Sequence, residues 1–277
     1  YRDKINELSK GELEIKWLGG PEVIPTPALA EAVIKGRVDI AYNVGMLFAD
    51  KIPGAAGIAF SPYTPMEERK NGIYEWLDGQ FRKGNLHLLA RGKTDMPFYT
   101  FTNFPVKALN DFKGKQIGGL DFSMGFFKAL GASVVNVPKP DWYTSVQRGV
   151  VDGYMLPTGN MVNYKLQEIT KYVVDHEINL NQEVIVINLK KWNSLPKHLQ
   201  KLMTDVAVQL EYDIRDFFQK DTIRARKVMK DAGLKFLKLS PEEAKRYIEI
   251  FRDSVWKDFV KIAGPEIAAE TKKVMFK

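Results

Sequence analysis

The feature that most constrains the fold is a long uninterrupted stretch in the last third of the sequence. Residues 197–232 contain neither proline nor glycine, and Ser194-Leu195-Pro196 and Gly233 flank them. Apolar side chains recur inside the stretch at helical spacing, as in Leu199, Met203, Val206, Leu210 and Ile214. A helix of this length extends over about 50 Å, which exceeds one small lobe. We predict a single rod that crosses two lobes, with a kinked pair of helices as the alternative.

The rest of the sequence alternates between helix and strand patterns. Thr64-Pro65 supplies an N-cap with proline at the first helical position, and the helix that it starts is expected to reach Leu77. Strands are expected at 13–17, 38–43, 86–90, 98–102, 116–119, 133–137, 153–156 and 183–188. This alternation predicts the α/β class with mostly parallel sheets, and 277 residues suffice for two modest lobes.

Composition and charge exclude several classes of protein. The sequence has no cysteine, which excludes a thiolate metal site, a disulfide framework and a cysteine nucleophile. No apolar run is long enough to span a membrane. The net charge of +7 comes from basic residues scattered among acidic ones, without an arginine-rich arm, so we expect no nucleic-acid partner. The opening residues resemble part of a helix rather than a signal peptide, so an export signal is not visible in this sequence.

A search for catalytic patterns finds none. The three histidines, His87, His176 and His198, lack the spacing of a zinc pair, and no nucleophile elbow or phosphate-binding glycine loop is present. The best acid–base pair that can be nominated is Asp121 with His176, which no spacing supports. We therefore expect a binding protein with no catalytic residues, no metal and no cofactor.

The ends of the predicted strands suggest where a ligand binds. Open α/β sheets bind ligands beyond the carboxyl ends of their strands. Here those ends are rich in aromatic residues, methionine and asparagine, which supply apolar walls and a few orienting hydrogen bonds. Each aromatic residue taken alone could equally serve core packing, and their recurrence at consecutive strand ends favours a pocket.

Several motifs resemble the solute receptors of tripartite ATP-independent periplasmic (TRAP) transporters, the DctP-type family. The most specific are Phe112–Ile117, Phe126–Ala132, Gln147–Gly153 and Trp192–Pro196, which follow one another in the family's order. The resemblance implies a two-lobed fold of the periplasmic-binding-protein type, with a long helix spanning both lobes and a solute enclosed between them on closure. It also implies a strand before the first helix of this sequence, so we expect further N-terminal residues.

The sequence departs from the family at its carboxylate clamp. The resemblance implies an arginine at the strand end after the Asp-Phe-Lys-Gly turn, where this sequence has Gly118. A second family arginine corresponds to Tyr99 or Thr100, and Met155-Leu156-Pro157 replaces the usual Glu-Asn-Pro. An arginine fork is a strong grip on a carboxylate. Lys139 or Arg91 is therefore expected to supply the compensating cation.

These observations combine into one prediction. We expect an extracytoplasmic, periplasmic receptor that binds a small organic solute, an organic acid with an apolar or aromatic part, and delivers it to TRAP membrane subunits. Lobe I is expected at 1–101 and 185–228, and lobe II at 102–184 and 229–277. The expected ligand-binding residues are Asn43, Arg91, Phe98, Tyr99, Gly118, Phe122, Lys139, Trp142, Tyr154, Leu156 and Asn160.

Alternatives to this prediction remain open. The solute could be neutral or an amine, and the chain could be an enzyme on a similar two-lobed scaffold. A sensor that binds solute but signals is a further alternative that the sequence does not separate from a transport receptor. A monomer is expected, and a dimer through the long helix is the other possibility.

Overall fold

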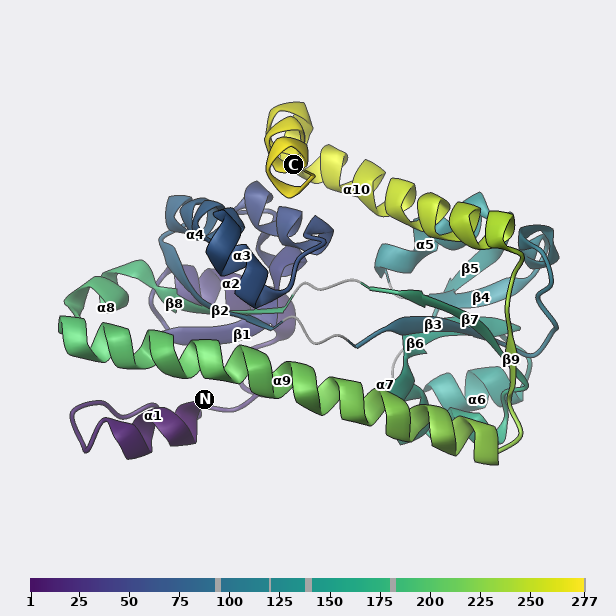
Figure 1. The fold of residues 1–277 in the computed structure, drawn as a ribbon, viewed down its shortest axis with the longest axis horizontal. Coiled ribbons are helices and arrows are strands. Elements are labelled where there is room, and N and C mark those ends of the chain that lie inside the picture. The colour runs from purple at the N-terminus through teal and green to yellow at the C-terminus, as the bar shows by residue number, and fades with distance from the viewer. Residues whose placement is uncertain (93–95, 120, 138–140, 180–182, 277) are drawn as a thin grey trace. The chain divides into compact units, whose positions relative to one another are not determined.

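The computed structural model describes residues 1–92, 96–119, 121–137, 141–179 and 183–276 (Figure 1). The chain forms two compact units, each built from separate segments of the sequence. The first unit takes residues 1–94, 181–217 and 259–277, and the second takes 95–180 and 218–258. Each unit has its own β-sheet and hydrophobic core.

A three-stranded antiparallel sheet with the order β1-β8-β2 organises the first unit. Strands β1 (Ile40–Val44) and β2 (Leu86–Gly92) both pair with β8 (Glu183–Asn188), which comes from a distant part of the sequence. The expectation of mostly parallel sheets is therefore wrong for this unit, because the returning strand runs opposite to both of its neighbours.

Short helices complete the first unit. They are α1 (Arg2–Leu8), α2 (Thr26–Ile34), α3 (Pro65–Asn71), α4 (Ile73–Lys83) and α8 (Leu189–Ser194), with 3-10 helices at Gly45–Phe48 and Pro53–Phe60. Helix α2 packs against β1, and α4 packs against β2. The core between them buries Phe48, Leu77 and Phe81 completely.

A glycine divides the helix that the sequence predicted from Thr64 to Leu77. The Thr64 hydroxyl accepts a hydrogen bond from the Glu67 N–H, and the Glu67 carboxylate accepts one from the Thr64 N–H, so the predicted cap is confirmed. Gly72 then adopts a left-handed backbone (φ 84°), which ends α3 before α4 begins.

The segment Leu13–Trp17 was predicted as a strand and is not one. The Ile15 N–H donates to Asn6 Oδ1 (2.7 Å), and the Ile15 carbonyl accepts from Asn6 Nδ2 (3.0 Å). A side chain from α1 thus makes the two hydrogen bonds that a neighbouring strand would make. The apolar alternation still has an effect, since Leu13 and Ile15 pack against the core while Trp17 is exposed.

A six-stranded mixed sheet forms the centre of the second unit, with the order β5-β4-β6-β3-β7-β9 among the described residues. Its strands are β3 (Phe98–Thr102), β4 (Gln116–Gly119), β5 (Ser133–Asn136), β6 (Gly153–Pro157), β7 (Tyr172–Ile178) and β9 (Lys235–Leu237). Strand β4 runs parallel to β5 and β6, whereas β3 runs antiparallel to β6 and β7. The predicted parallel arrangement therefore holds for β4, β5 and β6, and the sequence missed β7 and β9.

The two faces of this sheet carry different helices (Figure 1). Helices α6 (Trp142–Gln147) and α7 (Thr158–Asn163) lie on one face with the end of α9, and α5 (Asp121–Ala129) lies on the other with the start of α10. Side chains of β3 alternate accordingly. Tyr99 and Phe101 join the core formed with Trp142 and Met229, whereas Thr100 bonds to Tyr247 of α10.

Helix α9 (Lys197–Asp231) confirms the predicted rod as one helix of 35 residues. Its residues up to Phe217 belong to the first unit, and those from Phe218 belong to the second. Buried residues recur along it in both units, with Met203 and Ala207 in the first and Ala225 and Met229 in the second. The unbroken helical spacing of apolar residues therefore serves two cores.

Helix α10 (Pro241–Met275) is interrupted at Gly264 (φ 79°), which Pro265 follows. Residues from Phe259 onward belong to the first unit. There Phe259 packs on Phe60, with ring centroids 5.1 Å apart, and Met275 is buried in the first core. Neither α9, α10 nor any other helix in the described ranges carries an apolar run sufficient to span a bilayer.

The compact units differ in extent from the predicted lobes. Strand β3 was placed with lobe I and lies in the second unit, because it pairs with β6 and β7. Residues 259–277 were placed with lobe II and lie in the first unit, because their apolar side chains pack there.

Candidate functional site

Strand register brings most of the predicted binding residues of the second unit to one edge of its sheet. Strands β4 and β6 run parallel, with Gly118 beside Tyr154, so their carboxyl ends lie at the same edge. Strand β3 begins at that edge, because Phe98 pairs with Pro157. We call this the carboxyl edge, and it is where open α/β sheets bind ligands. It gathers Phe98, Tyr99, Gly118, Leu156 and the starts of α5, α6 and α7.

Trp142 occupies the space above Gly118. A Cβ atom on Gly118 would lie 3.0 Å from Cζ3 and 3.3 Å from Cη2 of Trp142. The indole is 1% exposed and meets the Tyr154 ring edge-on, with centroids 5.5 Å apart. A larger residue at 118 would therefore displace the indole, and the place where the resemblance implied an arginine holds an aromatic ring instead.

Phe98 and Phe122 form a second aromatic group at the carboxyl edge. Their rings meet edge-on with centroids 5.2 Å apart, and Phe122 also meets Phe251 of α10 at 6.3 Å. Both phenylalanines are half-buried. Edge-to-face pairs of this kind add about 0.5–1.5 kcal/mol each, so they fix the rings while leaving part of their surface open.

Tyr99 is held by charged neighbours from α9 and β7. Its hydroxyl donates to Glu177 (3.4 Å), and the Arg226 guanidinium lies 5.4 Å from its ring centre. Arg226 in turn pairs with Asp175 at 2.8 Å. Burial raises the pKa of Tyr99 to about 12, so the phenol stays protonated at neutral pH.

Tyr154 and Leu156 lie in the core of the second unit. Tyr154 is fully buried, and its hydroxyl shares a hydrogen bond with Thr170 (2.6 Å). Burial raises the pKa of this phenol far above its ordinary value. Leu156 is 3% exposed in the same core. Both side chains pack against protein, and their predicted solute contacts stay predictions.

Two further predicted residues follow the strands. Asn160 is half-buried on α7. Lys139 lies outside the described residues. The solute contacts of both stay predictions.

Asn43 is the predicted residue at the end of β1 in the first unit. It is 7% exposed, and its Oδ1 accepts a hydrogen bond from the Val44 N–H (2.9 Å). It also lines a cavity of about 650 Å³ beside β1, which is an edge strand. Most of the lining is apolar, including Leu13, Ile15, Leu29, Ile185 and Met203. No other predicted binding residue lines this cavity among the described residues.

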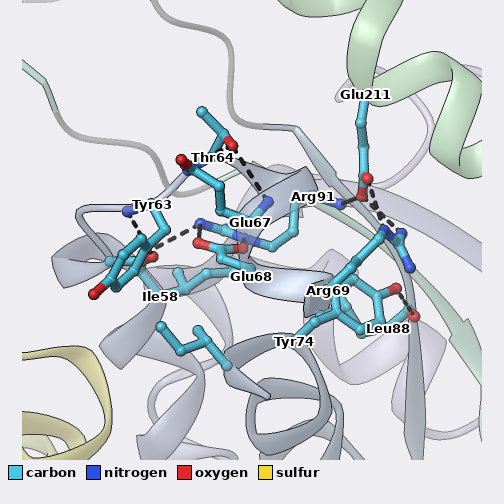
Figure 2. Close-up of polar contacts among 12 residues, drawn as sticks. Ile58, Tyr63, Thr64, Glu67, Glu68, Arg69, Tyr74, Leu88, Arg91 and Glu211 are labelled. Carbon is cyan, nitrogen blue, oxygen red and sulfur yellow. Dashed lines mark hydrogen bonds and ion pairs between the residues drawn. The ribbon is translucent and has the colours of Figure 1, made fainter. Parts of the chain in front are cut away.

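Arg91 is placed in a buried ion pair rather than at an open surface. Figure 2 shows its guanidinium against Glu68, with Nε 2.7 Å from Oε2 and Nη2 3.2 Å from Oε1. Nη2 also donates to the Ile58 carbonyl (3.4 Å), and both charged side chains are 0% exposed. The charge of Arg91 is therefore compensated inside the protein, and a solute contact stays a prediction.

A second ion pair lies beside the first (Figure 2). Glu211 of α9 accepts two hydrogen bonds from Arg69, each 2.8 Å long, and a third from the Arg91 backbone N–H (2.7 Å). Arg69 also stacks 3.8 Å from the ring centre of Tyr74, whose hydroxyl donates to the Leu88 carbonyl. This network ties α9 to α3 and β2 within the first unit.

The acid–base pair nominated from the sequence gains no support. His176 Nε2 accepts a hydrogen bond from the Leu239 N–H (2.9 Å), so this nitrogen serves the backbone. The Asp121 side chain lies outside the described residues. Among the described residues, no group of three or more histidine, aspartate or glutamate side chains could hold a metal ion.

Sequence reasoning overlooked Thr158, the first residue of α7 at the carboxyl edge. It lies directly after the Met155-Leu156-Pro157 segment and is 1% exposed. A threonine at a helix start is usually a cap, yet here the cap residue is Pro157 and no side-chain cap bond forms. The sequence offered only its position between two predicted residues, Leu156 and Asn160, as a signal.

Comparison with known proteins gives a family and a fold. The family model described as DctP, bacterial extracellular solute-binding protein, family 7, matches residues 1–261. A solute-binding protein of Albidiferax ferrireducens is 27% identical over an alignment that covers 94% of this chain and 79% of the relative.

Two solved structures share the fold. A TRAP periplasmic solute-binding protein of Desulfovibrio salexigens with bound orotic acid aligns with a TM-score of 0.81 and 20% identity, covering 99% of this chain and 92% of the other. The Bordetella pertussis receptor DctP6, described as binding pyroglutamic acid, aligns with a TM-score of 0.81 and 18% identity over the same shares.

Proposed function

The chain belongs to the DctP family of bacterial extracellular solute-binding proteins, and we propose that it captures a small organic acid outside the cytoplasm and delivers it to TRAP membrane subunits. The family match supports the receptor class, since it covers residues 1–261. We also propose that the chain is not an enzyme, because the family model that matches it describes solute-binding proteins.

The organic-acid assignment has two sources of support. Similar proteins are described as binding orotic acid and pyroglutamic acid, which are small cyclic carboxylic acids. The net charge of +7 favours the approach of an anion by long-range attraction. A neutral or amine solute is the alternative class.

The arrangement of the carboxyl edge is the observation that carries the site assignment. Phe98 and Phe122 present half-buried aromatic surface at this edge, and the buried Trp142 indole fills the space above Gly118. Apolar walls with a few polar groups are what a small-molecule site needs. We propose that these residues contact the ring or chain of the solute, and that Tyr99, Tyr154 and Leu156 support them from behind.

The carboxylate of the proposed solute is expected to bind a cationic side chain of the protein. Lys139 is the remaining predicted candidate once the charge of Arg91 is taken up by Glu68. Replacing Lys139 with methionine should weaken binding of an acid by more than tenfold, because a charged hydrogen bond contributes about 1.5–3 kcal/mol. Unchanged affinity in Lys139→Met would remove Lys139 from the site.

A thermal-shift and calorimetry screen tests the function. The panel contains orotate, pyroglutamate, malonate and galacturonate, together with polyols and amines of similar size. A ligand present at a hundred times its Kd stabilises the protein by about 2.7 kcal/mol. We expect a shift with at least one acid and none with the polyols or amines. A shift with an amine or polyol alone would overturn the acid assignment, and consumption of the solute would overturn the receptor assignment.

A further inference from the structure

Two buried polar atoms at the carboxyl edge lack a hydrogen-bond partner. Trp142 Nε1 and Thr158 Oγ1 are both enclosed, and neither has a partner in the part of the chain that the structure describes. Each residue is 1% exposed. Burying such a group without a partner costs free energy, so native proteins satisfy the great majority of them.

Other buried hydroxyls in the second unit are satisfied. Thr100 shares a hydrogen bond with Tyr247 (2.6 Å), and Thr102 donates to the Phe104 carbonyl (2.7 Å). Tyr154 and Thr170 form a third pair at 2.6 Å. Gln167 Oε1 also lacks a partner in the described part of this unit, and Trp142 and Thr158 are the two such residues that follow strands at the edge where ligands are expected.

The orientation of Trp142 leaves its N–H available. The atoms Cζ3 and Cη2, on the six-membered ring, are the ones closest to Gly118. Nε1 belongs to the five-membered ring, away from these two atoms, and it is buried without a hydrogen-bond partner among the described residues. An indole N–H can only donate, so its missing partner must be an acceptor such as a carboxylate, carbonyl or hydroxyl oxygen.

We propose that Trp142 and Thr158 are solute contacts, and that each donates a hydrogen bond to an oxygen of the bound organic acid. This inference rests on the proposed receptor function and specifies how the second unit recognises the solute. The recognition at these two points uses neutral donors, which suit a carbonyl or ring oxygen as well as a carboxylate. Specificity is strong in such a site, since a solute without the oxygens leaves both groups unpaired.

The test compares matched threonine-to-valine changes. Thr158→Val removes a hydroxyl that has no partner, whereas Thr102→Val removes one that bonds the Phe104 carbonyl. We expect the solute-free Tm of Thr158→Val to rise by roughly 2 °C or stay level, and that of Thr102→Val to fall. With orotate and pyroglutamate as probes, we expect Thr158→Val to bind roughly tenfold more weakly and Thr102→Val to bind as the wild type does.

Trp142 is tested by its own signal as well as by substitution. The chain has five tryptophans, and the indole N–H resonance that vanishes in Trp142→Phe identifies this one. We expect the resonance to shift downfield and exchange more slowly with solvent when orotate or pyroglutamate binds. Trp142→Phe keeps an aromatic ring and should weaken binding by roughly tenfold.

The outcomes separate this inference from the function that it deepens. A wild-type protein that binds a probe, with Thr158→Val unchanged in affinity, overturns the inference and leaves the receptor function intact. A lower Tm in solute-free Thr158→Val overturns it as well, since an ordered water or protein group must then satisfy the hydroxyl. If neither probe binds the wild type but another acid of the panel does, the same variants are compared with that acid, and if no acid of the panel binds, the organic-acid function and this inference both fail.

Discussion

In the first unit the buried charges of Arg91, Glu68 and Glu211 all have partners, whereas in the second unit the buried donors of Trp142 and Thr158 have none among the described residues. The charges of the first arrangement are compensated within the protein and need no counter-charge from outside. The second is incomplete, and a bound molecule can complete it. Burial of a polar group therefore does not identify a binding residue, but burial without a partner at a ligand-binding edge does indicate one.

The comparison also sharpens two expectations drawn from residue type. Arg91 was predicted to contact the solute because a cation suits an acid, and it is bonded to Glu68 through Nε and Nη2. Trp142 was predicted as a pocket wall, and its N–H is a buried hydrogen-bond donor without a partner among the described residues. The partners of a side chain, more than its chemical type, decide which role it can take.

The largest expected effect comes from breaking the first unit's ion pair. Glu68→Gln removes the buried carboxylate that accepts from Nε and Nη2 of Arg91, which should lower the free energy of unfolding by about 3–5 kcal/mol. Urea unfolding followed by circular dichroism measures the change. Asp205→Asn is the control, because its pair with Lys201 is exposed and contributes about 0–1 kcal/mol. Equal losses in the two variants would contradict the contrast between buried and exposed pairs.

Removing both members of that pair sharpens the comparison. The double substitution Arg91→Met with Glu68→Leu takes away both charges, and exchanges of this kind are often neutral or stabilising. We expect it to recover most of the stability that Glu68→Gln loses. Solute affinity, measured by calorimetry, should stay within threefold of the wild type. A large loss of affinity in this stable variant would indicate that Arg91 contacts the solute.

The next largest loss of stability is expected from disturbing the packing of Trp142 on Gly118. Gly118→Ala forces a Cβ atom to within 3.0 Å of the indole, and overpacking of this kind costs about 1–3 kcal/mol. The same change in a Trp142→Phe background should cost less, because phenylalanine lacks the crowded ring atoms. A double-mutant cycle measured by urea unfolding gives the coupling between the two positions. Additive losses would show that the indole moves aside freely.

Removing a hydrogen-bonded hydroxyl from the second unit should cause a smaller loss in the free energy of unfolding. Thr100→Val leaves the buried Tyr247 hydroxyl without its partner, so the free energy of unfolding should fall by about 1–2 kcal/mol. Adding Tyr247→Phe should recover part of the loss, because both polar groups are then gone. Thermal unfolding of the three variants provides the measurement, and no recovery in the double variant would indicate that packing dominates.

The smallest effect is a pH dependence at His176. Burial lowers the pKa of His176 below its ordinary value of 6.5, with Lys238 adding to the shift and Asp175 opposing it. The unfolded chain therefore binds more protons than the folded one below pH 6.5, and the free energy of unfolding falls as the pH drops from that value through the folded-state pKa. His176→Gln keeps an acceptor for the Leu239 N–H and removes the titration. The wild type should lose stability relative to this variant as the pH falls below 6.5, and parallel pH profiles would contradict the prediction.

Local patterns predicted most of the elements but not their partners. The spacing of apolar residues gave β3, β4, β8 and the full length of α9, because each depends on its own residues. The Leu13–Trp17 segment has the same alternation and forms no strand, since a strand also needs a second backbone beside it. The pairing of Arg91 with Glu68 depends on how α3 folds onto β2, and no local pattern contains that information.

In the candidate site, too, the features set by local sequence were predicted and those set by distant neighbours were not. The position of the carboxyl edge could be predicted, because parallel strands place their carboxyl ends together. Trp142 and Phe122 were identified in this way, whereas Phe98 lies at this edge because β3 runs antiparallel to β6 and begins there. Thr158 was not, because an unsatisfied hydroxyl is visible only when every neighbour has been placed.

The discontinuous core of the first unit has a consequence for the order in which the protein can be made. Residues 1–94 are synthesised before Val184, Val186 and Met275, which complete their core. The second unit has all of its residues by position 258. The first unit is thus begun before the second and completed after it. A chain cut before Met275 lacks a buried side chain of the core that residues 1–94 began.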